Sequence, residues 1–257
     1  MPSPPDRARR LCIIGDSHLA SVRQALDTGL IRLPGWEVEF WGAAGAAFRE
    51  IRMVDGAICA QGLAVPMVRQ VNGRDRTGIR PGDFDCYLFY GARLSVHHFL
   101  GPFLQRSLGE GVQDSGAALR AAAAAWLIET RAYRFARDFA KAGAEVYFAP
   151  ESLPTEGAKE YRIRRRVLHE NPAAARAGPA DRDRLWHALE EAAAAQGVTL
   201  LRQPEDTVTG GIFTAARWGL PDAARTQDAA HKTPAFAARM LQLFLAGACA
   251  DSTAAAS

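Results

Sequence analysis

Short apolar runs recur along the chain, each bounded by glycine, proline or aspartate, as is typical of buried β-strands. They predict five strands, over residues 11–15, 36–41, 85–91, 144–150 and 198–204. Helical patterns occupy most of the remaining intervals, over residues 19–29, 115–142, 180–196 and 233–247. For the last helix we expect Thr233 as the N-cap, Pro234 at the first helical position and Gly247 as the stop.

This alternation of strands and helices indicates parallel strand pairing. We therefore expect an α/β fold, a three-layer α/β/α sandwich around a flavodoxin-like, five-stranded parallel sheet in the order 2-1-3-4-5. In such sheets the functional groups gather at the carboxyl ends of the strands. Segments 15–18, 42–45 and 91–93 fall at those ends.

Two segments fit the sheet poorly, and long irregular connections in compact domains often form functional lids. The second segment, near 151–179, contains the basic run 161–166 (YRIRRR), which is either a solvated helix face or a binding site for an anionic partner. The expected layout is a disordered segment at 1–10, a single domain over 11–247 with irregular insertions near 61–84 and 151–179, and a flexible tail at 248–257.

The composition is that of an ordinary globular protein, since 48% of the 257 residues are hydrophobic and 23% are charged. A net charge of +3 gives no reason to expect nucleic acid or an anionic membrane as a partner. No stretch reaches the roughly 20 apolar residues that span a bilayer, and no signal-peptide core is recognisable. We therefore expect a cytoplasmic protein without a membrane span.

Motifs for cofactors are missing from the sequence. The four cysteines form no CxxC pair, which gives no indication of a zinc or redox site. Neither a Walker A sequence nor a GxGxxG fingerprint occurs, which argues against ATP and NAD. Flavin binding has only the analogy of the fold in its favour. We expect neither a metal nor an organic cofactor.

The segment Gly15-Asp16-Ser17-His18 joins the first predicted strand to the first predicted helix. A serine on such a turn has its hydroxyl above the edge of the sheet. Its backbone N–H lies where the helix dipole favours a developing oxyanion. Aspartate and serine are also common N-caps, so the tetrapeptide alone is a weak signal.

Asp228 and His231 lie just before the last predicted helix. A serine hydroxyl needs a base within hydrogen-bond reach to act as a nucleophile, and histidine has a suitable pKa. A carboxylate can fix the tautomer of that histidine and stabilise its cation. The alternative is a capping aspartate beside an exposed histidine.

Together these two motifs resemble the SGNH/GDSL hydrolase family. The first block of that family is a Gly-Asp-Ser turn after the first strand, and the last is Asp-x-x-His before the C-terminal helix. Their order along the chain is the order found here. The resemblance implies that Ser17 is the nucleophile, His231 the general base and acid, and Asp228 its orienting partner.

The middle blocks of the family supply donors to the oxyanion. The glycine of the second block corresponds to Gly45, with Gly42 as the other candidate. The third block, Gly-x-Asn, corresponds to Gly91-Ala92-Arg93, with arginine where asparagine is expected. Arg93 replaces the amide donor, binds an anionic group of the substrate, or marks a site without activity. Pairing of Arg93 with Asp228 would favour the last of these.

Asp16, His18 and His97 are the candidate pocket-lining residues. His18 stands where the family commonly has leucine, and at the start of a helix we expect it to point away from the triad. His97 and His98 are adjacent and lack a spaced carboxylate partner, so we expect them to face different directions and to bind no metal.

The resemblance implies a serine esterase or deacylase that forms an acyl-enzyme on Ser17. Its substrates would be small O-acyl esters, such as O-acetyl groups of a carbohydrate or metabolite, so the expected partner is a small-molecule or glycan ester. Two alternatives stay open. One is an O-acyltransferase with the same residues, and the other is a non-catalytic module that binds an anionic glycan or protein through Arg93 and the basic run.

Overall fold

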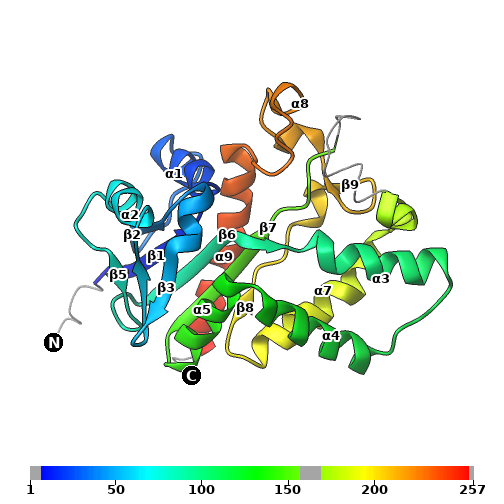
Figure 1. The fold of residues 1–257 in the computed structure, drawn as a ribbon, viewed down its shortest axis with the longest axis horizontal. Helices are drawn as coiled ribbons and strands as arrows, with labels where there is room; N and C mark the ends of the chain where they lie inside the picture. The colour runs from blue at the N-terminus through cyan, green and yellow to red at the C-terminus, as the bar shows by residue number, and fades with distance from the viewer. Residues whose placement is uncertain (1–6, 157–168, 255–257) are drawn as a thin grey trace.

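A five-stranded parallel sheet forms the centre of the computed structural model, which describes residues 7–156 and 169–254 (Figure 1). Its strands are β1 (Arg9–Gly15), β2 (Trp36–Gly42), β6 (Cys86–Ser95), β7 (Glu145–Glu151) and β8 (Thr199–Leu200). They pair in parallel in the order β2-β1-β6-β7-β8. The predicted fold class and strand order are therefore confirmed.

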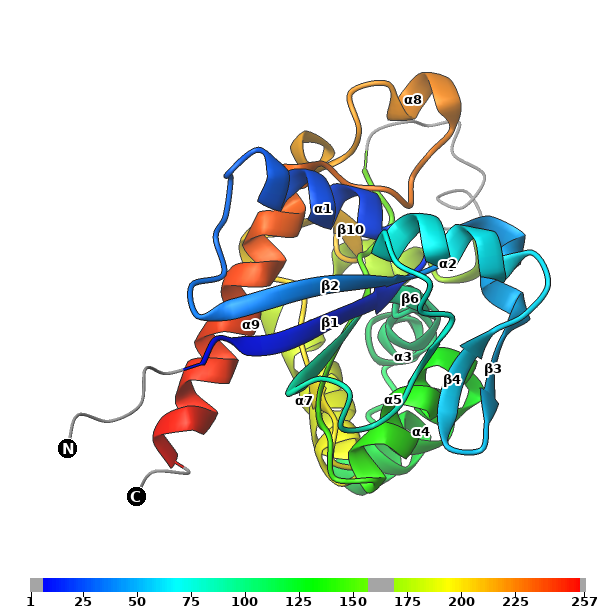
Figure 2. The same cartoon turned by 90° about the vertical axis from the view of Figure 1, so that its left-hand side faces the viewer.

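Helices cover both faces of this sheet (Figure 2). One face carries α1 (Leu19–Asp27) and α9 (Pro234–Ala254), and the other carries α4 (Gly116–Glu129), α5 (Arg131–Lys141) and α7 (Pro179–Ala194). Side chains along β1 alternate between the two cores. Leu11 and Ile13 pack with α1 and α9, whereas Cys12 and Ile14 pack on the opposite face. Burial on both faces explains why the strands read as continuous apolar runs.

Smaller elements lie around the sheet. They are α2 (Ala64–Asn72), α3 (His97–Gly109), α8 (Ala223–Thr226), β3 (Ile51–Val54), β4 (Ala57–Ala60), β5 (Gly78–Ile79), β9 (Val208–Thr209), β10 (Phe213–Thr214) and the 3₁₀ turns η1 (Gly45–Glu50), η2 (Pro172–Arg176), η3 (Glu205–Thr207) and η4 (Ala216–Trp218). Segment 61–84 thus contains α2 and β5, and its prediction as irregular is wrong. The basic run 161–166 lies outside the described residues.

Two predicted helices have different bounds in the structure. The helix expected over 115–142 is two helices, because Thr130 takes an extended backbone with ψ 122° between α4 and α5. The last helix begins as predicted, and the backbone N–H of Phe236 donates to the Thr233 hydroxyl at 3.4 Å. It does not stop at Gly247. A side chain there would lie 3.3 Å from the Tyr147 ring, so this glycine lets α9 pack closely on β7.

Two strands of the central sheet, β6 and β8, also differ from prediction. β6 runs beyond Gly91 to Ser95, because a bulge after Tyr90 shifts its register and brings Ser95 opposite Glu151. β8 is shorter than predicted. Within the described part of the chain, no helix has the length and apolarity needed to cross a membrane.

Candidate active site

The turn after β1 and the loop before α9 meet at the carboxyl edge of the sheet. His231 Nε2 lies 2.7 Å from Ser17 Oγ, and His231 Nδ1 lies 2.7 Å from Asp228 Oδ2. An ionised carboxylate only accepts hydrogen bonds, so Nδ1 carries the proton and Nε2 is free to accept one from the serine. The structure therefore brings together the three residues predicted to form a triad.

The Asp228 carboxylate is oriented by its own loop. Its Oδ1 accepts hydrogen bonds from the backbone N–H groups of Ala230 at 3.1 Å and His231 at 3.0 Å. Burial raises the pKa of Asp228, but the hydrogen bonds from the backbone and ring of His231 outweigh it and the net pKa is lowered. Asp228 is thus ionised at neutral pH, as a partner for an imidazolium must be.

Lys232 is buried and hydrogen-bonds to the backbone of the loop that joins Asp228 to His231. It is 3% exposed, and its Nζ donates to the carbonyl oxygens of Ala229 and Ala230 at 2.8 Å each. These two residues lie between Asp228 and His231, so Lys232 fixes the backbone that carries the acid–base pair. Burial lowers the pKa of Lys232 to about 7, although the charges of Asp228 and Glu151 partly oppose this.

This buried lysine predicts a dependence of stability on pH. Between pH 7 and about 10 the unfolded chain keeps the proton on Lys232, whose ordinary pKa is 10.5, while the folded chain loses it. The unfolded state then binds more protons, so the free energy of unfolding rises with pH, by at most about 1.4 kcal/mol per pH unit. Below pH 7 both states are protonated and this contribution no longer changes with pH.

Urea unfolding at pH 7, 8 and 9 measures this effect in the wild type and in Lys232→Met. We expect the rise to be smaller in the variant, and the difference between the two proteins to grow with pH. Parallel dependences in the two proteins would contradict the assignment of the rise to Lys232.

The predicted oxyanion donors include the backbone N–H groups of Ser17 and Gly45. Within the described residues, neither the backbone N–H of Ser17 nor that of Gly45 donates a hydrogen bond to another protein group. Both are thus available to a substrate oxygen. Gly45 has φ +57°, a left-handed conformation that glycine adopts without steric cost, and it begins the turn η1.

Arg93, near the end of β6, hydrogen-bonds to the turn that begins at Gly45. One Nη of its guanidinium donates to the Gly45 carbonyl oxygen, and its Nε lies 3.7 Å from the Asp16 carboxylate. No ion pair joins it to Asp228 within the chain as described. The pairing that would have favoured an inactive site is therefore not formed. Arg93 instead hydrogen-bonds to Gly45, the residue that is predicted to supply an oxyanion donor.

His18 does not point away from the triad, and that prediction is wrong. Its ring stacks on the His231 ring, with centroids 4.9 Å apart. Its Nδ1 lies 2.7 Å from Asp16 Oδ1. Burial lowers the pKa of His18, but the hydrogen bond and charge of Asp16 outweigh it and the pKa is raised. Two Asp–His pairs thus lie side by side, and His231 is the one that reaches Ser17.

Gly91 makes this stacking possible. With φ +68° it has a left-handed backbone, and a Cβ on it would lie 2.7 Å from His18 Cβ. Any larger residue would push the His18 ring out of place. Gly91 therefore contributes to the site by leaving room for the His18 ring.

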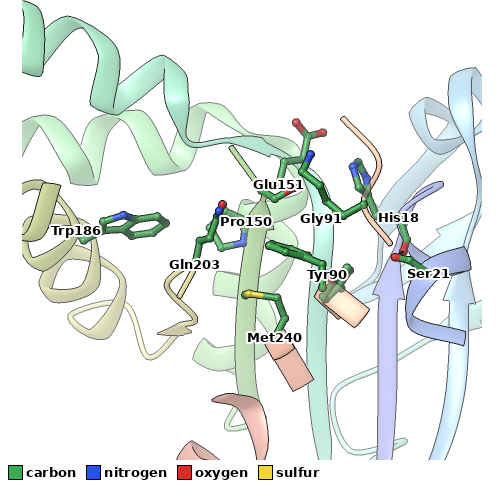
Figure 3. A pocket seen from close by; sticks show the side chains of 12 residues that line it. His18, Ser21, Tyr90, Gly91, Pro150, Glu151, Trp186, Gln203 and Met240 are labelled. Atoms are coloured by element: carbon green, nitrogen blue, oxygen red, sulfur yellow. Dashed lines mark hydrogen bonds between the residues drawn. The ribbon is translucent and has the colours of Figure 1, made fainter. Parts of the chain in front are cut away.

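A narrow cavity lies beside His18, the residue that follows Ser17 (Figure 3). His18 and Glu151 lie at its end near the sheet edge, and Tyr90 and Met240 lie deeper. Its volume of about 10 Å³ holds roughly one water molecule, so it is too small for a substrate. His18 lines this cavity as predicted, whereas the Asp16 carboxylate is occupied by His18 and Arg93.

A larger cavity of about 210 Å³ lies on the histidine side of the triad. Ala229 and Ala230, from the loop between Asp228 and His231, form part of its wall. Its other lining residues come from β6, α3, the end of β7 with the segment after it, and the segment before η2: Ser95, His97, His98, Pro102, Glu151, Ser152, Pro154, Glu170 and Asn171. This is the best-placed space for a substrate group.

His97 lines this larger cavity, as predicted. His98 lines it too, with the two ring centroids 4.1 Å apart, so the expectation that they face different directions is wrong. They are the first two residues of α3.

One group of side chains has the spacing of metal ligands. Asp16, His18 and Glu151 offer ligand atoms within 4.8 Å of one another. Two of these residues already pair with each other, and the Ser95 hydroxyl donates to Glu151. We therefore interpret these three residues as part of the wall of the candidate site. Sequence reasoning missed Glu151 and Ser95, although Glu151 directly follows a predicted strand at the carboxyl edge.

Comparison with known proteins adds little to this geometry. No protein-family model matches the chain, and no curated protein matches it. Among solved structures it is similar to an extracellular lipase from Streptomyces rimosus, with 12% identity and a TM-score of 0.43 over 91% of this chain and 99% of the lipase. At this level of likeness, any assignment of function depends on the geometry of the site.

Proposed function

We propose that this protein is a serine esterase or deacylase of SGNH type that hydrolyses small O-acyl esters of a carbohydrate or metabolite. The observation that carries the proposal is the continuous chain from Asp228 through His231 to Ser17, with both hydrogen bonds at 2.7 Å. A carboxylate, an imidazole and a hydroxyl in this order form the arrangement that activates a serine nucleophile.

The proposed reaction has two halves. Ser17 Oγ attacks the ester carbonyl carbon while its proton passes to His231 Nε2, and the imidazolium is stabilised by Asp228. The carbonyl oxygen becomes an oxyanion that accepts hydrogen bonds from the N–H groups of Ser17 and Gly45. Collapse of this intermediate breaks the bond to the alcohol, which leaves with the proton from His231. Water then attacks the acyl-enzyme through the same histidine and releases the acid.

The larger cavity supports a polar alcohol as the leaving part of the substrate. It opens beside Ala230 and presents the side chains of Ser95, His98 and Asn171, which suit hydrogen bonds to hydroxyl groups. The Ser95 hydroxyl already donates to Glu151, but an alkyl chain of a lipid ester would offer no hydrogen bond to His98 or Asn171, at a cost of about 1–3 kcal/mol for each group that is buried. We therefore favour hydroxyl-rich esters with a short acyl group.

Hydrolysis of p-nitrophenyl acetate and p-nitrophenyl butyrate tests the proposal. We expect turnover by the wild type, with the acetate preferred, and loss of turnover in Ser17→Ala. Ser21→Ala is the matched control, because Ser21 lies one helical turn away and its hydroxyl donates to the His18 carbonyl oxygen at 2.9 Å. Absence of turnover in folded wild type, or equal turnover in Ser17→Ala, would overturn the proposal.

A further inference from the structure

Four arginines line an open hollow beside η1, the turn that begins at Gly45. The hollow has a volume of about 420 Å³, and Phe48, Thr130 and Ala132 complete its wall. The arginines come from four different elements, η1, β3, β6 and α5, and they are Arg49, Arg52, Arg93 and Arg131. Segments far apart in the sequence thus bring four positive charges to one place.

Most of this charge has no carboxylate partner. Across residues 7–156 and 169–254, no ion pair within 4.0 Å involves Arg49, Arg52 or Arg131, and Arg93 has Asp16 at 3.7 Å. In a salt-bridged surface each of these cations would have an acidic neighbour. Here the repulsion between them is left uncompensated, which favours the binding of an anion.

Hydrogen bonds to the backbone hold two of these arginines in place without neutralising them. Arg131 donates to the carbonyl oxygens of Phe48 and Arg49 at 2.7 Å each, and Arg52 donates to the carbonyl oxygen of Arg49. The pKa of Arg131 is lowered by burial and by the charges of Arg52 and Arg93. The guanidinium of Arg49 is exposed and has no hydrogen-bond partner in the described part of the chain.

The start of α5 lies at the same hollow. Thr130 is the N-cap of this 11-residue helix, yet its hydroxyl makes no capping hydrogen bond, and the first turn contains no acidic residue. Thr130, Arg131 and Ala132 all line the hollow. The N–H groups and the positive end of the helix dipole are therefore available there to an anionic ligand.

We infer that this hollow binds a phosphate or sulfate group, through Arg49, Arg52 and Arg131 together with the N-terminus of α5. Guanidinium groups and helix N-termini both donate to the oxygens of such tetrahedral anions. Arg93 lies between the hollow and the turn that carries Ser17, because it also contacts Gly45 and Asp16. The anion is either a free ligand or, if the proposed function holds, a group carried by the ester substrate.

Titration with inorganic phosphate and with sodium sulfate tests the site directly, by calorimetry at constant ionic strength against sodium chloride. It uses the Ser17→Ala variant, so that the outcome does not depend on catalysis. We expect saturable binding to Ser17→Ala, and we expect it to weaken at least tenfold when Arg49→Gln and Arg52→Gln are introduced into that variant. Arg32→Gln is the matched control, since Arg32 is exposed and lies outside the hollow. No saturable binding, or equal binding in the double variant, would overturn the inference.

Thermal unfolding in chloride shows whether the double variant is folded. We expect it to be at least as stable as its parent, because two uncompensated charges have been removed. Loss of binding together with a lower melting temperature would instead point to a structural role for Arg52 and contradict the site.

Active protein then identifies the source of the anion. Hydrolysis of an O-acetylated sugar is compared with hydrolysis of the same sugar carrying a phosphate. A kcat/KM at least tenfold higher for the phosphorylated ester, lost in Arg49→Gln/Arg52→Gln, assigns the anion to the substrate. Equal values in a protein that binds inorganic phosphate assign it to a free ligand. Failure of all ester turnover would count against the proposed function and leave the calorimetric result standing.

Discussion

Replacing His231 with glutamine abolishes ester hydrolysis, with an expected loss of kcat by a factor on the order of 10⁴ to 10⁶. His231 Nε2 lies 2.7 Å from Ser17 Oγ, and no other base lies at hydrogen-bond distance from that hydroxyl in the described chain. Glutamine can preserve a hydrogen bond but cannot take up the proton. The substitution therefore removes general-base catalysis while largely keeping the shape of the loop. Steady-state hydrolysis of p-nitrophenyl acetate measures the loss.

The neighbouring histidine provides the matched control. His18 is stacked on His231 and paired with its own aspartate, Asp16. Its ring makes no hydrogen bond to the Ser17 hydroxyl in the described chain, so we expect His18→Gln to affect the reaction through the position of the His231 ring, at a cost of up to about 10²-fold. An equal loss in the two variants would contradict the assignment of the base to His231.

Asp228→Asn lowers kcat by about 10⁴ with the fold intact. The neutral amide no longer enforces the proton on His231 Nδ1 and no longer stabilises the imidazolium. Because the pKa of Asp228 is lowered, the wild-type carboxylate is ionised throughout the neutral range, and the loss is expected at every pH from 6 to 8. Stopped assays across that range, with urea unfolding to confirm the fold, measure it.

Asp222→Asn is the control for this substitution. Asp222 lies in the same connection and pairs with Arg225 at 2.7 Å, on the exposed side of α8. Exposed ion pairs contribute little, so this variant keeps its activity. A loss of less than tenfold in Asp228→Asn, or a similar loss in both variants, would show that the carboxylate does not assist the histidine.

The central sheet could be predicted from the sequence because burial on both faces gives its strands an unbroken apolar signature. α3 could not, because it begins with two histidines and contains Gly101 and Pro102, a pair that is typical of turns. α2 was hidden for a related reason. Pro66 indicates a break, but it lies in the first turn of the helix, where its missing N–H would have no partner anyway.

At the site, the three residues of the proposed triad could be predicted because their motifs are local and fall at strand and helix ends. The role of Arg93 could not, since its contacts with Gly45 and Asp16 depend on three loops meeting. The bulge in β6 after Tyr90 has Gly91 as its one sequence signal, and a glycine there fits the end of a strand equally well. The bulge brings Ser95 to Glu151 and shapes the larger cavity.

The central claim is that Ser17 is an activated nucleophile, and covalent labelling tests it most directly. The folded protein is treated with a fluorophosphonate, and the modified peptide is located by mass spectrometry. The account predicts one adduct, on Ser17, formed in the wild type and in Ser21→Ala but not in Ser17→Ala or His231→Gln. No adduct in folded wild type, or an adduct on another serine, would contradict it.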